Sequence, residues 1–378
     1  MDLSIYFESI KNKHLVNKSR LGSQITGFFE GDDFPNYSDS KVVLFGVKSN
    51  KTDADSDAIR EYLYHLAAIE TLKNVTDLGN IISSENLSDN GFAISDIITN
   101  LVKQNKIVVI IHGSRITTHG IYSAFAKLEQ LINLTVVDQT VQLGDMSEAL
   151  NDDNYLSKIM LSENNYLFNF CQLAHQSHFT GREQLDLLDR LNFDHIRLGA
   201  LREHIEKSEP VFRNSDVTIF NLSSVRMSDS PGTEEAGPNG LFGEEYCRLA
   251  RYAGVCDKTT VAGFFEYNST YDHRGVSAHL QAQAIWYYLE GVSLRQEDFP
   301  IGTKENYTKY IIDSKDGGSI EFLKSNKSER WWITVPVPSG KQNKFFRHHL
   351  VPCTYGDYQL ACNNELPDIW IKTLQKFG

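Results

Sequence analysis

The stretch Asp216–Gly232, DVTIFNLSSVRMSDSPG, decides the fold of this 378-residue chain. Apolar side chains recur at Val217, Ile219 and Leu222, and a polar segment with a Pro-Gly turn follows. The pattern predicts a buried strand that carries polar side chains at its carboxyl end. In a doubly wound sheet, ligands bind at the carboxyl ends of the strands. We therefore expect functional side chains near the end of this strand.

Apolar runs of strand length alternate with amphipathic helical segments along most of the chain. The predicted strands are Val42–Val47, Ile107–Ile111, Leu134–Val137, Tyr166–Cys171, Val217–Leu222 and Val261–Phe265. The predicted helices are Ser56–Ala68, Ala93–Lys103, Ile121–Ile132, Glu183–Leu191, Glu244–Tyr252 and Ser277–Leu289. This alternation predicts a three-layer α/β/α domain, in which helices cover both faces of a parallel sheet.

The domain boundaries follow from where the alternation begins and ends. Residues 1–40 are turn-rich and are expected to form an irregular lead-in to the α/β/α domain, which we place at 41–298. The remainder, 299–378, lacks the alternation and predicts a C-terminal α+β extension packed on the core. Its predicted elements are the strands Ser319–Phe322 and Trp331–Val337, the short helix Tyr358–Cys362 and a last helix from Pro367 toward Lys376.

The composition excludes several classes of partner. A net charge of −12 and a pI near 5.5 argue against a nucleic acid or an anionic membrane, because both need a basic surface. No apolar run approaches the roughly 18 residues of a membrane-spanning helix. The five cysteines are odd in number and lack metal-type spacing, which indicates reduced thiols. We expect a cytoplasmic protein with no nucleic-acid partner and no membrane insertion.

Several segments occur in a fixed order that is informative about function. They are VTDLGN at 75–80, VVIIHGSRITTHGIYSAF at 108–125, VVDQTVQ at 136–142, the stretch that ends at Pro231-Gly232, and GFFEYN at 263–268. These segments resemble the ureohydrolase family, which contains arginase, agmatinase and formimidoylglutamase. The segment GPNGLFGEE at 237–245 resembles the formimidoylglutamase-like branch. The resemblance covers about residues 41–291 and implies an arginase-like fold and metal-dependent hydrolysis of an amidino group.

The resemblance also locates the family's metal site in this chain. In the family, two manganese ions share a bridging hydroxide that attacks the amidino carbon. The six metal-ligand positions fall on Arg115, Asp138, Thr140, Gln142, Asn221 and Ser223. Asp138 is the one carboxylate that remains, whereas hard divalent cations need several carboxylates and imidazoles. A guanidinium about 4 Å from a dication opposes it by roughly 8 kcal/mol at an effective dielectric constant of about 20.

We therefore expect a degenerate site with no catalytic residues, no bound metal and no cofactor. The histidine pairs His175/His178 and His348/His349 also fall short of the ligand number of a zinc site. No nucleophile elbow, phosphate-binding loop or dinucleotide-binding motif suggests other chemistry.

Without metal ions, the buried polar side chains of this pocket need other partners for their charges and hydrogen bonds. A buried Asp138 needs a counter-charge, and we expect Arg115 to supply it through hydrogen bonds. Gln142, Asn221 and Ser223 are expected to satisfy the remaining donors and acceptors.

Two further residues are candidates for contacting a ligand at this edge. Glu266 matches the glutamate that holds the guanidinium or formimino group in the family, although a solvated or ion-paired carboxylate is an equal alternative. Arg226 is expected to lack a partner, which leaves it able to hold a carboxylate or phosphate at the mouth of the pocket or to remain solvated.

Two functions from different classes follow from these residues. The first is a ureohydrolase-fold pseudoenzyme, without the dimanganese site, that acts by binding an unidentified protein partner or small ligand, with assembly into a homo-oligomer left open. The alternative is a formimidoylglutamase- or arginase-type hydrolase of a C–N bond in a linear amidine. The missing ligands favour the first interpretation, and the sequence leaves enzymatic activity uncertain.

Overall fold

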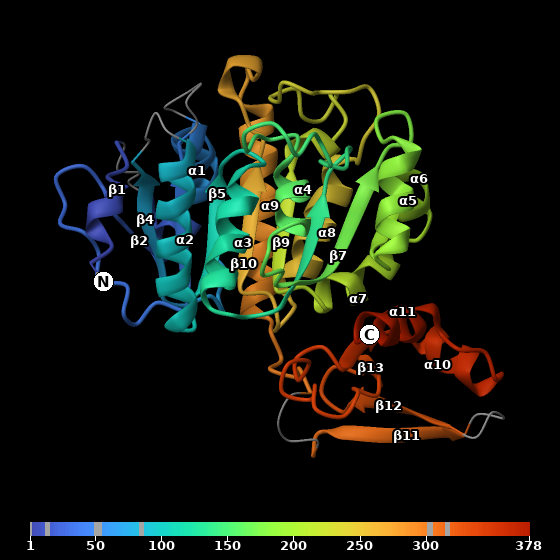
Figure 1. The fold of residues 1–378 in the computed structure, drawn as a ribbon. Coiled ribbons are helices and arrows are strands. Elements are labelled where there is room, and N and C mark those ends of the chain that lie inside the picture. The colour runs from blue at the N-terminus through green and yellow to red at the C-terminus, as the bar shows by residue number, and fades with distance from the viewer. Residues whose placement is uncertain (1, 12–15, 49–54, 83–86, 301–304, 314–317) are drawn as a thin grey trace.

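The computed structural model describes residues 2–11, 16–48, 55–82, 87–300, 305–313 and 318–378 (Figure 1). A ten-stranded sheet has the strand order β1-β4-β3-β5-β10-β9-β6-β7-β8, and β2 also pairs with β4. Its strands are β1 Phe7–Glu8, β2 Ile25–Gly27, β3 Val42–Val47, β4 Val75–Ile81, β5 Ile107–His112, β6 Ile132–Val137, β7 Leu167–His175, β8 Asp194–Arg197, β9 Val217–Asn221 and β10 Val261–Phe265. Strand β1 pairs antiparallel with β4, and the other described pairings in this sheet are parallel.

Helices cover both faces of the sheet, so the predicted three-layer α/β/α architecture is confirmed (Figure 1). Alternate residues of β3 show the two faces, because Val42 and Leu44 join one buried apolar cluster while Val43 and Phe45 join the other. One face is covered by α1 Asp55–His65, α6 Leu198–Glu203, α7 Ser208–Arg213, α8 Gly243–Gly254 and α9 Val276–Ser293. The other is covered by α2 Leu87–Lys103, α3 Thr117–Lys127, α4 Tyr155–Met160 and α5 Arg182–Arg190. Within the described residues, no helix combines the length and the apolar character that crossing a membrane requires.

Some elements differ from the sequence-based expectation. The first 40 residues contribute β1 and β2 to the edge of the sheet, where both pair with β4. Helix α3 ends at Lys127, five residues before β6 begins at Ile132, because Glu129 adopts a left-handed backbone conformation with φ of 52°. Strand β8 was not predicted, since its sequence DHIR carries charge at both ends and is only partly buried.

The C-terminal residues form a second sheet with the order β11-β12-β13-β14. Its strands are β11 Tyr307–Asp313, β12 Ser319–Ser325, β13 Trp331–Thr334 and β14 Leu350–Cys353, and the helices α10 Tyr355–Cys362 and α11 Asp368–Lys376 follow. Neither β11 nor β14 was predicted. The exposed residues of β11 alternate with partly buried ones, which is typical of an edge strand, and β14 contains a proline.

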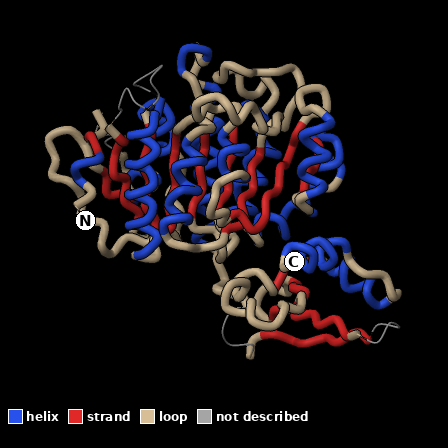
Figure 2. The backbone as a smooth tube through the Cα atoms, in the orientation of Figure 1, coloured by secondary structure: helices blue, strands red, loops and turns tan. Residues whose placement is uncertain are grey.

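The second sheet and its helices lie against the amino-terminal ends of the core strands (Figures 1 and 2). Phe168, near the start of β7, packs against Phe345 and Phe377, whose ring centroids lie 5.6 and 5.7 Å from its own. Arg213 of α7 donates to the backbone oxygens of Trp331 and Cys353 at 2.8 and 3.1 Å. The C-terminal unit is therefore joined to the core by aromatic packing and by buried hydrogen bonds.

Arg213 gives a direct test of this junction. Arg213→Ala is expected to lower the free energy of unfolding by about 1–3 kcal/mol, because two backbone acceptors lose their donor. Denaturant unfolding followed by tryptophan fluorescence measures the loss. Arg182→Ala is the matched control, since the Arg182 side chain is 92% exposed. Equal unfolding free energies for Arg213→Ala and the parent protein would contradict the role of this contact.

Candidate functional site

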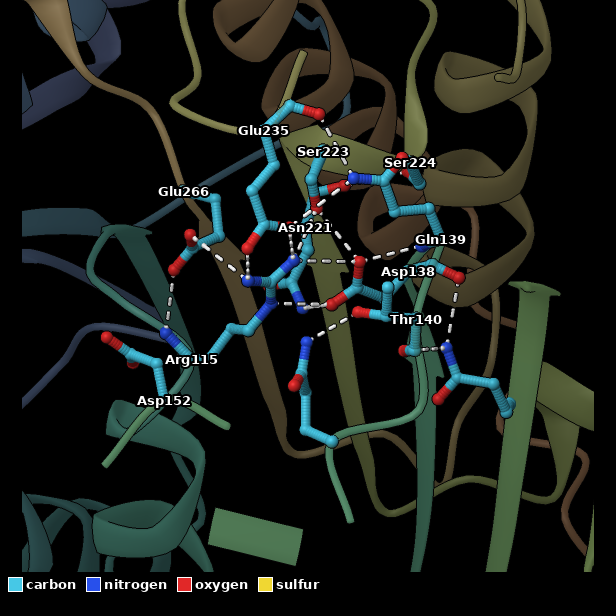
Figure 3. Close-up of polar contacts among 12 residues, drawn as sticks. Arg115, Asp138, Gln139, Thr140, Asp152, Asn221, Ser223, Ser224, Glu235 and Glu266 are labelled. Carbon is cyan, nitrogen blue, oxygen red and sulfur yellow. Dashed lines mark hydrogen bonds and ion pairs between the residues drawn. The ribbon is translucent and has the colours of Figure 1, made fainter. Parts of the chain in front are cut away.

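Four neighbouring strands bring the candidate residues together at the carboxyl edge of the sheet. The strands lie in the order β5-β10-β9-β6, so their carboxyl ends are adjacent. Arg115 follows β5, Glu266 follows β10 and Asp138 follows β6. Asn221 is the last residue of β9, and Ser223 lies two residues beyond it. Figure 3 shows their side chains converging on the Arg115 guanidinium.

The Arg115 guanidinium and the Asp138 carboxylate form a buried ion pair. Nε of Arg115 donates to Oδ2 of Asp138 at 2.8 Å, and Nη2 donates to Oδ1 at 3.2 Å. Arg115 is 2% exposed and Asp138 is 0% exposed. Burial lowers the pKa of Arg115, but the charges of Asp138 and Glu266 and the hydrogen bonds to Glu235 and Asp138 together outweigh burial, and the pKa lies well above its ordinary value. The predicted pairing of these two side chains is confirmed.

The remaining acceptor sites of Asp138 are also occupied. The Asn221 amide donates to Oδ2 at 2.7 Å, and the Ser223 hydroxyl donates to Oδ1 at 2.8 Å. The backbone N–H of Gln139 adds a third donor at 2.7 Å. The expected roles of Asn221 and Ser223 are confirmed, whereas the expected contact of Gln142 is wrong.

Gln142 instead donates to the Thr140 hydroxyl, two residues away, and neither side chain has a hydrogen bond to the ion pair. The Thr140 hydroxyl satisfies the Gln142 amide locally, so the amide does not need an acceptor in the pocket. Thr140 and Gln142, both expected at former metal-ligand positions, thus pair with each other beside the site.

Glu235 is a second carboxylate on Arg115 that the sequence analysis missed. Its Oε1 and Oε2 accept hydrogen bonds from Nη1 and Nη2 of Arg115 at 2.8 and 2.7 Å, which is a bidentate arrangement. Burial raises the pKa of Glu235, but the hydrogen bonds and charge of Arg115 and a hydrogen bond from Gln139 together outweigh burial and lower the pKa. The signal available in the sequence was the acidic pair Glu234-Glu235, which closely follows Pro231-Gly232.

Glu266 borders the ion pair in an unusual backbone conformation. Its φ is +70°, a left-handed conformation that costs a non-glycine residue of order 1–3 kcal/mol and that clusters at functional sites. Its N–H donates to the oxygen of Gly113 at 3.0 Å, and its Oε1 accepts from the Arg115 N–H at 2.9 Å. The side chain is 17% exposed. Burial raises the pKa of Glu266 to about 7, although Arg115 opposes the shift.

A cavity of about 290 Å³ opens beside Glu266, between β5, α3 and the loop after β10. Its charged lining consists of the carboxylates of Asp152, Glu234 and Glu266 and the ammonium of Lys48, which pairs with Glu8 outside the cavity. The buried imidazole of His112 also lines it, and burial together with the Arg60 charge lowers the pKa of His112 to about 3. The lining is therefore acidic at neutral pH and presents a neutral histidine.

The residues at the carboxyl edge do not fit a dimanganese centre. A guanidinium lies between the Asp138 and Glu235 carboxylates, and both of their oxygens bond to it. Asn221 uses its amide N–H group toward Asp138, so it acts as a donor there. Within the described parts of the chain, no group of three or more histidine, cysteine, aspartate or glutamate side chains is arranged to hold a metal ion.

Arg226 lies away from this pocket and has a partner, so the expectation of an unpaired arginine is wrong. Its Nε donates to Oδ1 of Asp229 at 2.8 Å, and its guanidinium carbon lies 4.0 Å from the ring centroid of Phe242. Asp229 stands three residues after Arg226, a spacing at which a local turn brings the two side chains together.

A double-mutant cycle tests the Arg115–Asp138 pair. Arg115→Ala is expected to lower the free energy of unfolding by about 3–5 kcal/mol, because it leaves a buried carboxylate without its counter-charge. The double mutant Arg115→Ala/Asp138→Asn should lose at least about 1 kcal/mol less unfolding free energy than the sum of the losses in the two single mutants. The exposed pair Lys127 and Asp96 is the control, with a coupling below about 1 kcal/mol. Additive effects at Arg115 and Asp138 would refute the pairing as a stabilising interaction.

The raised pKa of Glu266 predicts a pH dependence of stability. An unfolded glutamate has a pKa of about 4.3, so the folded protein binds the extra proton between about pH 5 and 7. Stability then falls as the pH rises through this window. Glu266→Gln removes the titration, and its unfolding free energy relative to the parent protein should increase from pH 5 to 7 and level off above about pH 8. A difference that stays constant with pH, as expected for the exposed control Glu183→Gln, would contradict the shift.

Solved structures share this architecture, although no protein-family model matches the sequence and curated proteins give no significant match. A manganese-containing formiminoglutamase from Trypanosoma cruzi has a TM-score of 0.62 and 14% identity, covering 69% of this chain and 96% of that chain. The formimidoylglutamase from Bacillus subtilis has a TM-score of 0.64 and 15% identity, covering 75% and 95%. The proclavaminate amidino hydrolase from Streptomyces clavuligerus has a TM-score of 0.61 and 16% identity, covering 74% and 99%. The chain therefore has the fold of the arginase superfamily.

Proposed function

We propose that this chain is a ureohydrolase-fold protein without the dimanganese centre, which binds a small cationic ligand beside Glu266 and does not hydrolyse it. The observation that carries the proposal is the distribution of charge around Arg115. Its guanidinium makes bidentate contacts with both Asp138 and Glu235, whereas the nearest oxygen of Glu266 to any guanidinium nitrogen is 3.8 Å away. Among the three carboxylates around Arg115, Glu266 therefore has the least compensated charge, and it lines the cavity.

The electrostatics of the cavity favour a cation. One built-in positive charge at Arg115 is shared by three carboxylates, and Asp152 and Glu234 add further negative charge to the lining. In a partly buried site of effective dielectric about 20, a unit cation about 4 Å from one carboxylate gains roughly 4 kcal/mol. The raised pKa of Glu266 reflects the same shortage of positive charge, because burial exceeds the help from Arg115.

The chemical class of the ligand follows from the shape of the acceptor and from the structural neighbours. A planar amidinium presents two parallel N–H groups, which match the two oxygens of a carboxylate. The neighbours are named for formimino and amidino substrates. We infer a linear amidine or guanidine, and the cavity of about 290 Å³ is near the lower end of small-molecule sites.

Hydrolysis is not part of the proposal, because the nucleophile of the family needs two metal ions. At the corresponding position this chain has Arg115, whose charge repels a dication and whose N–H groups already use the nearby oxygens. We further place the protein in the cytoplasm, which the five free cysteines support. A protein partner at this edge, or a residual hydrolase, is the competing function that the following experiment separates.

Isothermal titration calorimetry with agmatine, arginine and N-formimino-glutamate tests the binding. We expect saturable binding of at least one of them, lost in Glu266→Gln and retained in the exposed control Glu183→Gln. Affinity should rise by about tenfold from pH 6 to pH 8, because the fraction of ionised Glu266 rises with pH through a pKa of about 7.

Parallel incubation with manganese and the same compounds tests catalysis. The proposal predicts no release of ammonia or urea and no stoichiometric manganese after gel filtration. Hydrolysis would favour the alternative enzyme, and the absence of binding by all three compounds would refute the ligand class.

A further inference from the structure

A second hollow at the carboxyl edge is lined by three arginines and two histidines in a chain whose net charge is −12. It has a volume of about 410 Å³ and lies at the ends of β7 and β8, beside α6 and the loop 238–242. Its ionisable lining consists of His175, His178, Arg197, Arg202 and Arg226, and no carboxylate side chain lines it. We call these five residues and the hollow between them the basic groove.

Two of the three arginines are fixed in place before any ligand arrives. The guanidinium carbons of Arg202 and Arg226 both lie 4.0 Å from the ring centroid of Phe242. Nε of Arg202 donates to Glu245 at 3.1 Å, and Nε of Arg226 donates to Asp229 at 2.8 Å. These carboxylates are outside the lining of the groove, and in the described part of the chain the Nη groups of both arginines make no hydrogen bond.

The carboxylates that hold the arginines are themselves anchored at the start of α8. Oδ2 of Asp229 accepts from the N–H of Gly243 at 3.0 Å, and Oε2 of Glu245 accepts from the N–H of Phe242 at 2.8 Å. Each arginine is thus positioned by a chain of contacts that ends in the backbone. Such preorganisation lowers the entropic cost of binding.

The other members of the groove have unused binding capacity. Arg197 is exposed and has no ion pair with any described residue, so its charge is not compensated within the structure. His175 is 3% exposed, and its Nδ1 has no hydrogen-bond partner among the described residues. A buried polar atom without a partner is costly, and a bound group is one way to satisfy it.

We propose that the basic groove binds the phosphate group of a small phosphate monoester. Guanidinium forks match the oxygens of a phosphate, and their hydrogen bonds to it are charge-assisted. The groove is larger than one phosphate, which leaves space for the organic part of a metabolite. Because the groove is lined by residues that do not line the Glu266 cavity, it forms a second site with the opposite charge preference.

Calorimetric titration of the full chain at low ionic strength tests the groove, with inorganic phosphate, glycerol phosphate and succinate as probes. Glycerol phosphate is expected to bind saturably and more tightly than succinate. Arg197→Gln should weaken this binding by about tenfold, because it removes one charge-assisted contact without disturbing a buried partner. Arg182→Gln, an exposed arginine on α5 outside the groove, should leave it unchanged.

The outcomes separate the groove from the Glu266 cavity. Agmatine binding should be the same in Arg197→Gln and in the parent protein, so a failure of one site leaves the other testable. Absence of saturable binding by both phosphate compounds would overturn the proposal. Equal losses in Arg182→Gln and Arg197→Gln, or tighter binding of succinate than of glycerol phosphate, would also overturn it.

Discussion

The buried ion pair between Arg115 and Asp138 is the constraint on which the arrangement of the carboxyl edge depends. Four parallel strands end there, and their ends place Arg115, Asp138, Asn221 and Glu266 within reach of one another. A carboxylate that is removed from water costs several kcal/mol unless a counter-charge and hydrogen bonds replace the lost hydration. Asp138 receives both, because five donated hydrogen bonds reach its two oxygens.

A cation that belongs to the chain differs physically from a bound metal ion. The guanidinium has fixed N–H directions, whereas a dication attracts any oxygen within its coordination sphere. Arg115 therefore organises Asp138 and Glu235 by hydrogen-bond geometry and leaves Glu266 at the margin. This division of charge explains why the pKa of Glu266 is raised to about 7 beside an arginine, since Arg115 compensates the burial of Glu235 more than that of Glu266.

The sequence predicted those features that depend on strand periodicity and on motif position. The three-layer fold follows from the alternation of strands and helices, and the Arg115–Asp138 pair follows from the positions of the family's metal ligands. Glu235 was missed because it lies in a loop that folds back over the strand ends, and loop paths have no periodic signal. The predicted contact of Gln142 with the ion pair was wrong because the Gln142 amide donates to the Thr140 hydroxyl, two residues away.

Most of the strands that the fold prediction missed are short or half-exposed, although the buried seven-residue strand β4 was missed as well. Strand β8 carries a charged residue at each end, and β11 has exposed residues between partly buried ones, so neither forms a continuous apolar run. Their pairing depends on partner strands that are distant in the sequence, and the β-propensity of individual residues does not report such contacts. The partner of Arg226, in contrast, was visible in the sequence as an acidic residue three positions later.

The placement of the C-terminal unit has a practical consequence. Parallel strands have two inequivalent ends, and in this chain the second sheet lies at the amino ends (Figure 1). The Glu266 cavity and the basic groove lie at the carboxyl ends. Core strands such as β9 are five residues long, so the two edges are separated by roughly 17 Å of extended chain. A surface anchor or fusion partner attached after Gly378 would project from the amino edge and leave the opposite edge open to solvent.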